Sequence, residues 1–159
     1  MAFAVGDRVV YPHHGATVVE RVETVEVLGS VREYLVLHFP DGELTLRIPS
    51  DAAGAVGLRE VISGGEVSDV FSVLRRRDVR VPSNWSRRFK NHTAMLKSGD
   101  VYQLAEVVRN LSHRNAEARL STAEQRMLVR ARRVLTSELC LALGEDTERV
   151  DALLDDALH

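Results

Sequence analysis

A single tryptophan, Trp85, lies among positively charged residues in the segment 83–90. Its neighbours Ser83 and Asn84 favour the N-cap position, so the ring is predicted at the start of a helix. An aromatic ring at a helix tip beside cations suits double-stranded DNA, because the cations hold phosphates while the ring meets the bases. The other interpretation is a Trp that anchors a small helical core through an N–H bond to a backbone carbonyl. The candidate phosphate contacts beside the ring are Arg87, Arg88 and Lys90.

A second set of cations has helical spacing. A capping-box pattern at its start and a glycine after its end predict a long helix over residues 121–143. Glu124 is the only acid between positions 118 and 137, so pairing within this helix cannot neutralise its cations. One face of the helix can therefore pack while another meets phosphates. The cationic stripe, roughly 125° from the apolar stripe by helical geometry, consists of Arg126, Arg130 and Arg133.

The distribution of charge favours a polyanion site in the middle of the chain. The net charge is −2, but residues 75–133 carry 15 Lys and Arg against 5 acids, a net of +10. The flanking segments, 1–74 and 134–159, are each net −6. Fields are screened within about 10 Å at 0.1 M salt, so the local charge decides what binds there. The alternative is an ordinary solvated helical surface.

Residues for catalysis or metal binding do not occur at useful spacings. The six His and the single Cys140 offer no paired ligand motif, and the sequence has no phosphate loop and no nucleophile elbow. We therefore expect no enzyme, no cofactor and no metal. No apolar run is long enough to span a bilayer, the start of the sequence lacks a signal-peptide pattern, and one Cys suits a reducing compartment. We expect a cytoplasmic protein without a membrane partner.

The elements that must position these residues divide the sequence into two halves. Alternating or β-branched segments at 8–11, 16–27, 32–39 and 44–48, separated by turn residues near 12–15, 28–30 and 40–43, predict short strands. Such strands favour a small, strongly bent β-barrel of SH3 or Tudor type. Helical spacing follows in segments that begin near 63, 83, 100, 121 and 147. The predicted fold class is α+β, with a barrel domain over residues 1–58 and an all-α domain over residues 59–159.

Several segments together resemble the CarD/CdnL family of bacterial transcription regulators, and most closely its actinobacterial CarD branch. They run in order along nearly the whole chain, and their joint occurrence is more specific than any one of them. The segments are VGDRVVYPHHGA (5–16), YLVL (34–37), LTLRIP (44–49), NWSRR (84–88), GDV (99–101), AEVVR (105–109), LS (120–121) and RML (126–128).

The resemblance implies a Tudor-like N-terminal domain that docks on the β subunit of RNA polymerase in the sigma-containing holoenzyme. It also implies a helical domain set against promoter DNA at the upstream edge of the transcription bubble. In the family, the Trp of the Asn-Trp-Ser motif wedges into the minor groove and stabilises the open complex, and it corresponds to Trp85. Phosphate contacts correspond to Arg87 and Lys90, and a further basic surface to Arg126, Arg130 and Arg132. We expect weak sequence specificity, a monomer, and association with the nucleoid through polymerase.

The sequence departs from the family pattern at two positions. Arg47 matches a polymerase-contacting Arg in the fourth strand, but the second basic contact of the family falls on Val25. Another basic position is Gln125, which reduces the expected DNA footprint. Two other classes of function stay open: a polymerase-independent architectural DNA-binding protein, and a protein adaptor in which Trp85 belongs to the core.

Overall fold

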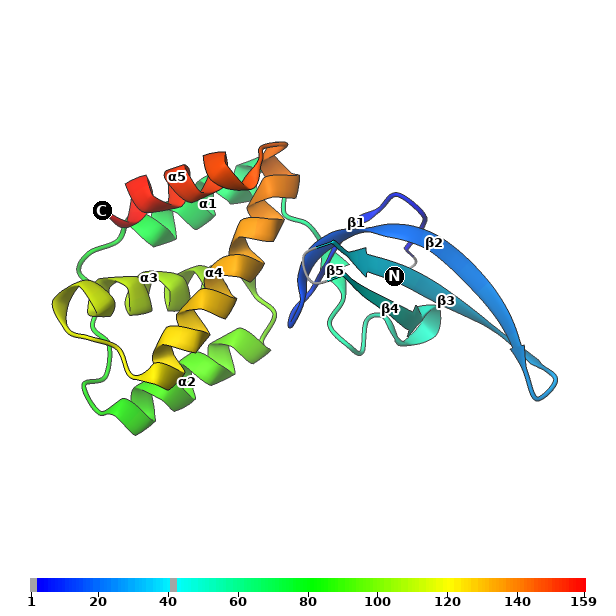
Figure 1. Ribbon diagram of the computed structural model, residues 1–159, viewed down its shortest axis with the longest axis horizontal. Coiled ribbons are helices and arrows are strands. Elements are labelled where there is room, and N and C mark those ends of the chain that lie inside the picture. The colour runs from blue at the N-terminus through cyan, green and yellow to red at the C-terminus, as the bar shows by residue number, and fades with distance from the viewer. Residues whose placement is uncertain (1–2, 41–42) are drawn as a thin grey trace. The chain divides into compact units, whose positions relative to one another are not determined.

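The computed structural model describes residues 3–40 and 43–159 and divides the chain into two compact units, one ending at Val61 and one starting at Ile62 (Figure 1). The first unit is an antiparallel sheet and the second is helical, which confirms the predicted α+β class. Residues 59 and 60 pair with the first strand, so they lie with the sheet and the helical unit begins after them.

The sheet has the strand order β4-β3-β2-β1-β5. Strand β2 pairs with β1 on one side and β3 on the other, with an irregularity in register between Val19 and Arg21. Such an irregularity bends a strand, and β2 arches strongly in Figure 1. The strands are β1 (Arg8–Tyr11), β2 (Gly15–Val27), β3 (Ser30–Phe39), β4 (Leu44–Pro49) and β5 (Arg59–Glu60), with a short 3-10 turn η1 (Ser50–Ala52) after β4.

Alternation along β3 separates the core face of the sheet from the opposite face, as the sequence predicted. Leu35, Leu37 and Phe39 point into a core shared with Val9 and Ile48 and other apolar residues. The opposite face carries the residues in between, and the register places position 47 of β4 and position 21 of β2 on either side of Val36. This opposite face therefore gathers charged side chains from three strands.

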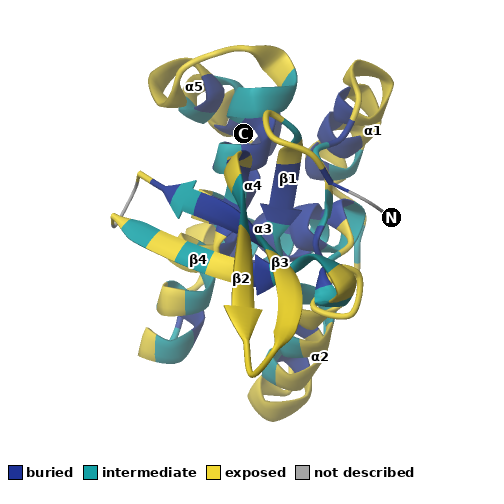
Figure 2. Ribbon diagram, turned by 90° about the vertical axis from the view of Figure 1, so that its right-hand side faces the viewer, coloured by how far each residue is buried: buried dark blue, intermediate teal, exposed yellow. Residues whose placement is uncertain are grey.

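Strands β2 and β3 continue as a two-stranded ribbon beyond the core. The turn between them places Leu28 and Gly29 at φ angles of 51° and 80°, the left-handed conformation that a two-residue hairpin turn requires. The free end of the ribbon is exposed along both strands (Figure 2). The other hairpin turn predicted from the sequence includes Asp41 and Gly42, which lie outside the described residues.

Five helices form the described part of the second unit. Each begins at a polar N-cap whose side chain accepts a backbone N–H, and α4 ends at Gly144, which adopts the left-handed conformation at φ 68°. The last helix is capped by Asp146, one residue before the Thr147 suggested by the sequence pattern. The helices are α1 (Gly64–Arg75), α2 (Trp85–Lys97), α3 (Val101–Glu117), α4 (Thr122–Leu143) and α5 (Thr147–Leu158).

The helical core comes mainly from α1, α3, α4 and α5, which contribute nearly all of its buried apolar residues. Helix α2 differs, because its two fully buried side chains are polar: Arg88 and His92. Residues 76–84 join α1 to α2 within the helical unit. Helix α2, which carries the tryptophan, is thus docked by directed polar contacts more than by apolar burial.

Candidate functional site

Trp85 is the first residue of α2, and the residue is 43% exposed. Asn84 caps the helix by accepting the backbone N–H of Arg87 at 3.0 Å. One face of the indole stacks on Phe89, with ring centroids 5.0 Å apart and planes 14° from parallel. The indole N–H donates to the Ser121 hydroxyl at 3.0 Å, and no backbone carbonyl serves as the acceptor. The ring is therefore a fixed surface feature, not the anchor of a core.

Arg88 is not a phosphate contact, which corrects the expectation from the sequence. Its side chain is 2% exposed and forms a bidentate ion pair with Glu124, with Nε–Oε2 at 2.8 Å and Nη2–Oε1 at 3.1 Å. Its remaining Nη1 donates to the carbonyls of Pro82 and Ser83. Every nitrogen of this guanidinium is thus satisfied inside the protein. Arg88 fastens the start of α2 to the first turn of α4.

Glu124 explains why the capping box predicted at the start of α4 is only half formed. The Ser121 hydroxyl accepts the Glu124 backbone N–H at 3.2 Å, as expected of an N-cap. The Glu124 carboxylate turns to Arg88, whose hydrogen bond holds the pKa of this carboxyl below its usual range. The local sequence does not indicate the bond of Trp85 to Ser121 or that of Arg88 to Glu124, because in each case the two residues lie 36 positions apart.

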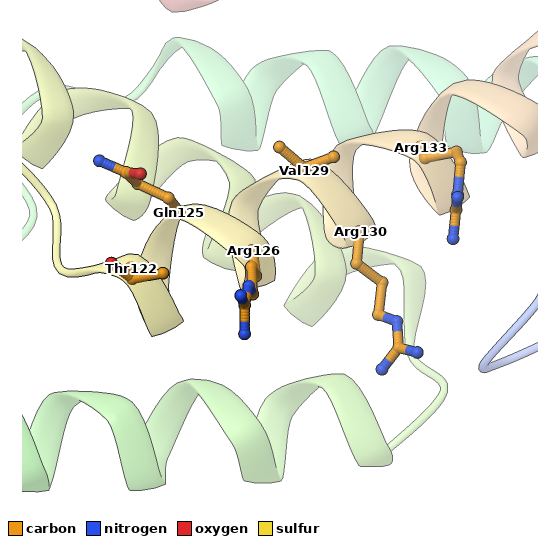
Figure 3. Close-up of a pocket in the computed structure, with 6 residues that line it drawn as sticks. All are labelled: Thr122, Gln125, Arg126, Val129, Arg130 and Arg133. Atoms are coloured by element: carbon orange, nitrogen blue, oxygen red, sulfur yellow. The ribbon is translucent and has the colours of Figure 1, made fainter.

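The arginine stripe of α4 lines a shallow, open groove together with Thr122, Gln125 and Val129 (Figure 3). Arg126, Arg130 and Arg133 project from one side of the helix, and Val129, which extends from another side of it, is 67% exposed. Within the part of the chain that the structure describes, none of these three arginines forms an ion pair. Arg87 and Lys90 on α2 are exposed as well. These five cations stay candidates for phosphate contacts.

Arg132 does not belong to that surface, which is a second correction. Its guanidinium donates to Asp155 at 2.8 Å, to the carbonyl of Asp151 at 3.3 Å, and lies 3.6 Å from the Asp151 carboxylate. Position 132 lies about 100° or more around the helix from the other arginines, so it faces α5. The acids that neutralise Arg132 belong to α5, so the sequence of α4 alone does not indicate this pairing.

In the sheet unit, Arg47 and Val25 lie on the same face, although on different strands. Arg47 donates through Nε to Glu23 at 3.1 Å, and Glu23 also accepts from Arg21 at 2.8 Å. These hydrogen bonds, first that of Arg21 and then that of Arg47, lower the pKa of Glu23. Val25 is 38% exposed and has Arg32 directly opposite on β3. A cation is therefore present beside the position where the family pattern expects one.

His92 lies on the buried face of α2, against α3, and burial lowers its pKa. Its Nε2 lies 3.2 Å from the side-chain nitrogen of Asn110, while Nδ1 has no hydrogen-bond partner. The negative charge of Glu124 acts in the opposite direction and the positive charge of Arg88 in the same direction as burial. The pKa of His113 on α3 is also lowered, again mainly by burial.

We expect these histidines to make the stability of the helical unit depend on pH, because the pKa of each is lowered in the folded protein. An unfolded His gains its proton near pH 6.5, whereas a buried His with a lowered pKa stays neutral. The unfolded state then binds more protons, so stability falls as pH drops below about 6.5 toward the folded pKa. We expect His92→Gln to weaken this loss, measured as urea midpoints at about pH 7 and pH 5.5. An unchanged pH dependence in the variant would contradict the assignment.

Metal-ligand groups and membrane-spanning helices are absent from the described residues. It places no group of three or more His, Cys, Asp and Glu side chains in an arrangement that could hold a metal ion. No described helix combines the length and hydropathy that crossing a membrane demands. Cys140 packs against the helical core, and burial raises the pKa of its thiol. The exposed ring with its basic groove and the charged sheet face are the candidate sites.

Comparison with known proteins gives consistent matches along the chain. The family model "CarD-like/TRCF RID domain" matches residues 3–62, and "CarD, C-terminal domain" matches residues 69–155. The chain is 31% identical to "Putative transcription factor YdeB" of Bacillus subtilis (strain 168), over 89% of this chain and 93% of that protein. A solution NMR structure of the 72-residue N-terminal domain of Myxococcus xanthus CarD is 30% identical, covers 37% of this chain and 79% of that chain, and superposes with a TM-score of 0.32.

Proposed function

The chain belongs to the CarD family of transcription factors, and from this premise we propose that it acts on transcription initiation. In this proposal the sheet unit binds the β subunit of RNA polymerase in the sigma-containing holoenzyme. The helical unit contacts promoter DNA at the upstream edge of the bubble and stabilises the open complex. Such a protein works in the cytoplasm, at the nucleoid, and needs no cofactor.

The exposed, fixed ring of Trp85 is the observation that carries the DNA part of the proposal. Because Phe89 covers one face of the indole, only the other face and the free edge can meet a base. A ring presented in this way suits a distorted or opened step better than a continuous duplex, where bases are already stacked. The surrounding cations hold phosphates and carry no sequence information, which fits a factor of weak sequence specificity.

The charged face of the sheet supports the polymerase part. Arg47, Arg32 and Arg21 lie on this face around Glu23, so the face can exchange ion pairs with a partner surface. We propose that Arg32 supplies the second cation of the contact, in place of the family's basic residue at Val25. Its present partners are weak ones: the ring of Tyr34 at 5.9 Å and the exposed Asp51 at 3.5 Å.

Charge reversal at Arg47 tests the polymerase contact. Arg47→Glu removes a cation and places a second carboxylate beside Glu23, so we expect binding to the isolated β subunit to weaken by at least about tenfold. The change in folding stability should stay small, because exposed ion pairs contribute only about 0–1 kcal/mol. Titration of the full-length chain against the β subunit, together with thermal melting, measures both quantities.

The control for this test changes Glu23 instead. Glu23→Gln releases Arg47 from its present partner, so binding should stay equal or become stronger. A second control, Arg149→Glu on α5, should leave binding to polymerase unchanged. Unaltered binding by a correctly folded Arg47→Glu variant would refute the assignment of this face.

Salt dependence tests the phosphate contacts of the α4 groove. The logarithm of the affinity should fall with the logarithm of salt, with a slope of about −0.9 for each phosphate contact on a duplex. Arg130→Gln should therefore make the slope less steep by about 0.9. The matched change Arg132→Gln on the same helix should leave the slope unaltered, because Arg132 is already held by α5.

The measurement uses the full-length chain and a DNA fork that mimics the bubble edge. We expect weak binding without polymerase, because the chain as a whole is net acidic, and tethering through polymerase raises the effective concentration. Equal slopes for the wild type and Arg130→Gln would exclude a phosphate contact at this position. Tight, sub-micromolar binding without polymerase would instead favour the architectural DNA-binding protein.

A further inference from the structure

Helix α2 has a weaker apolar anchor than its neighbours, because its Met95 and Leu96 are only partly buried against the helical core. Helix α3 buries Val101, Leu104 and other apolar residues along its length, whereas the two fully buried residues of α2 are Arg88 and His92. Apolar contacts are non-directional, but hydrogen bonds fix a direction and a distance. The orientation of the first half of α2, and of the ring at its first position, therefore depends mainly on a small number of polar contacts.

The Ser121 hydroxyl is the point at which these contacts meet. It accepts the indole N–H of Trp85 at 3.0 Å and the backbone N–H of Glu124 at 3.2 Å. It lies 3.4 Å from Glu124 Oε1, to which it donates. A hydroxyl has one donor and two acceptor positions, so its full capacity is used. The same Glu124 carboxylate holds Arg88, so one network joins the ring edge, the start of α4 and the body of α2.

Two contacts therefore restrict rotation of the indole ring. The edge is held by Ser121, and one face is held by Phe89. An exposed aromatic side chain without such contacts exchanges between rotamers, and binding must then select one of them. A ring that is already held in one rotamer loses less conformational entropy when it binds DNA.

We propose that Ser121 is a positioning residue, which holds Trp85 in its DNA-binding orientation before DNA binds. The buried Arg88–Glu124 pair supports this role by fixing the start of α2 to α4. This inference rests on the proposed function for its consequence, but its structural part concerns the free protein alone. Because Ser121 also begins α4, the network sets the ring relative to Thr122, Arg126 and the rest of the groove. The ring and the phosphate contacts then meet DNA as one rigid surface.

The chain supplies a matched control within itself. Ser63 is the N-cap of α1, accepts the N–H of Glu66 and has a Glu three positions on, as Ser121 does at α4. Ser121→Ala and Ser63→Ala therefore remove the same kind of cap and should lower stability by similar amounts. Only the first removes a partner of Trp85. Ser121→Thr keeps a hydroxyl at the same place and serves as the conservative rescue.

Fluorescence reports the ring directly, because Trp85 is the only tryptophan of the chain. In the free full-length protein, we expect Ser121→Ala to lower the anisotropy of Trp emission and to raise its quenching by acrylamide. Ser63→Ala and Ser121→Thr should match the wild type. In open complexes with polymerase, Ser121→Ala should shorten the lifetime by about fivefold, the factor that one ordinary hydrogen bond supports. Ser63→Ala should leave the lifetime per folded molecule unaltered.

Each result decides the inference. Unchanged anisotropy and quenching in Ser121→Ala would show that Ser121 does not hold the ring, and would overturn it. A loosened ring with an unchanged lifetime, while Trp85→Ala shortens the lifetime, would also overturn it, because orientation would then not matter. If Trp85→Ala itself leaves the lifetime unchanged, the proposed function fails, and the fluorescence alone decides whether Ser121 orients the ring.

Discussion

Replacement of Glu124 by Ala is expected to destabilise the helical unit by about 3–5 kcal/mol, which is the typical effect of removing one partner of a buried ion pair. Arg88 would keep its charge in a site where it is 2% exposed and would lose both carboxylate contacts. Single domains have total stabilities of about 5–15 kcal/mol, so the variant should be partly unfolded at modest urea concentrations. Chemical denaturation followed by far-UV circular dichroism measures the change.

The exposed Glu117 near the end of α3 provides the control, and Glu117→Ala should shift stability by no more than about 0.5 kcal/mol. Replacing both partners, Arg88→Met with Glu124→Leu, should recover much of the loss, because no charge is then left unpaired. A loss below about 1 kcal/mol for Glu124→Ala alone would mean that the pair is solvated and does not fasten α2 to α4.

Trp85→Ala is expected to shorten the lifetime of the open promoter complex by roughly tenfold, which corresponds to about 1.4 kcal/mol of lost stabilisation. Folding and polymerase binding should persist, since Trp85 is 43% exposed and lies outside the helical core. A core Trp would instead lose about 3–5 kcal/mol of folding stability on truncation. The experiment combines a denaturation curve with decay of open complexes on the same variant.

Trp85→Phe separates the contribution of the aromatic ring from that of the indole N–H group. Phe keeps an aromatic face on Phe89 but cannot donate to Ser121, so an intermediate lifetime is expected. If Trp85→Ala lowers stability by several kcal/mol and leaves the decay per folded molecule unchanged, Trp85 is a structural residue. The adaptor interpretation would then replace the DNA wedge.

The fold could be predicted from the sequence wherever a local pattern decides the structure. Alternation along β3 and the apolar spacing of α4 depend on residues a few positions apart, and Gly144 marks a helix end that requires a positive φ. Strand β5 was missed because two residues are too short to show a period. Its existence depends on pairing with β1, about fifty positions earlier in the chain.

The site could be predicted only in part, for a related reason. Trp85 and the α4 stripe are recognisable from residue type and spacing, yet whether a cation is available depends on partners distant in sequence. The local sequence predicts Arg88 as a phosphate contact, but the side chain is buried in an ion pair with Glu124. Arg132 forms an ion pair with Asp155 of another helix. Ser121 was predicted as a helix cap, but nothing in the local sequence indicates its bond to the indole.

Decay of promoter open complexes, formed by RNA polymerase of the same organism and challenged with a competitor, tests the proposed function most directly. The full-length wild-type chain should slow the decay several-fold when added at a concentration that saturates the polymerase. Arg47→Glu should lose this effect through weaker binding, and Trp85→Ala should lose it while still bound. Decay that is unchanged by saturating wild-type protein, with its binding to polymerase verified, would contradict the proposed role in open-complex stabilisation.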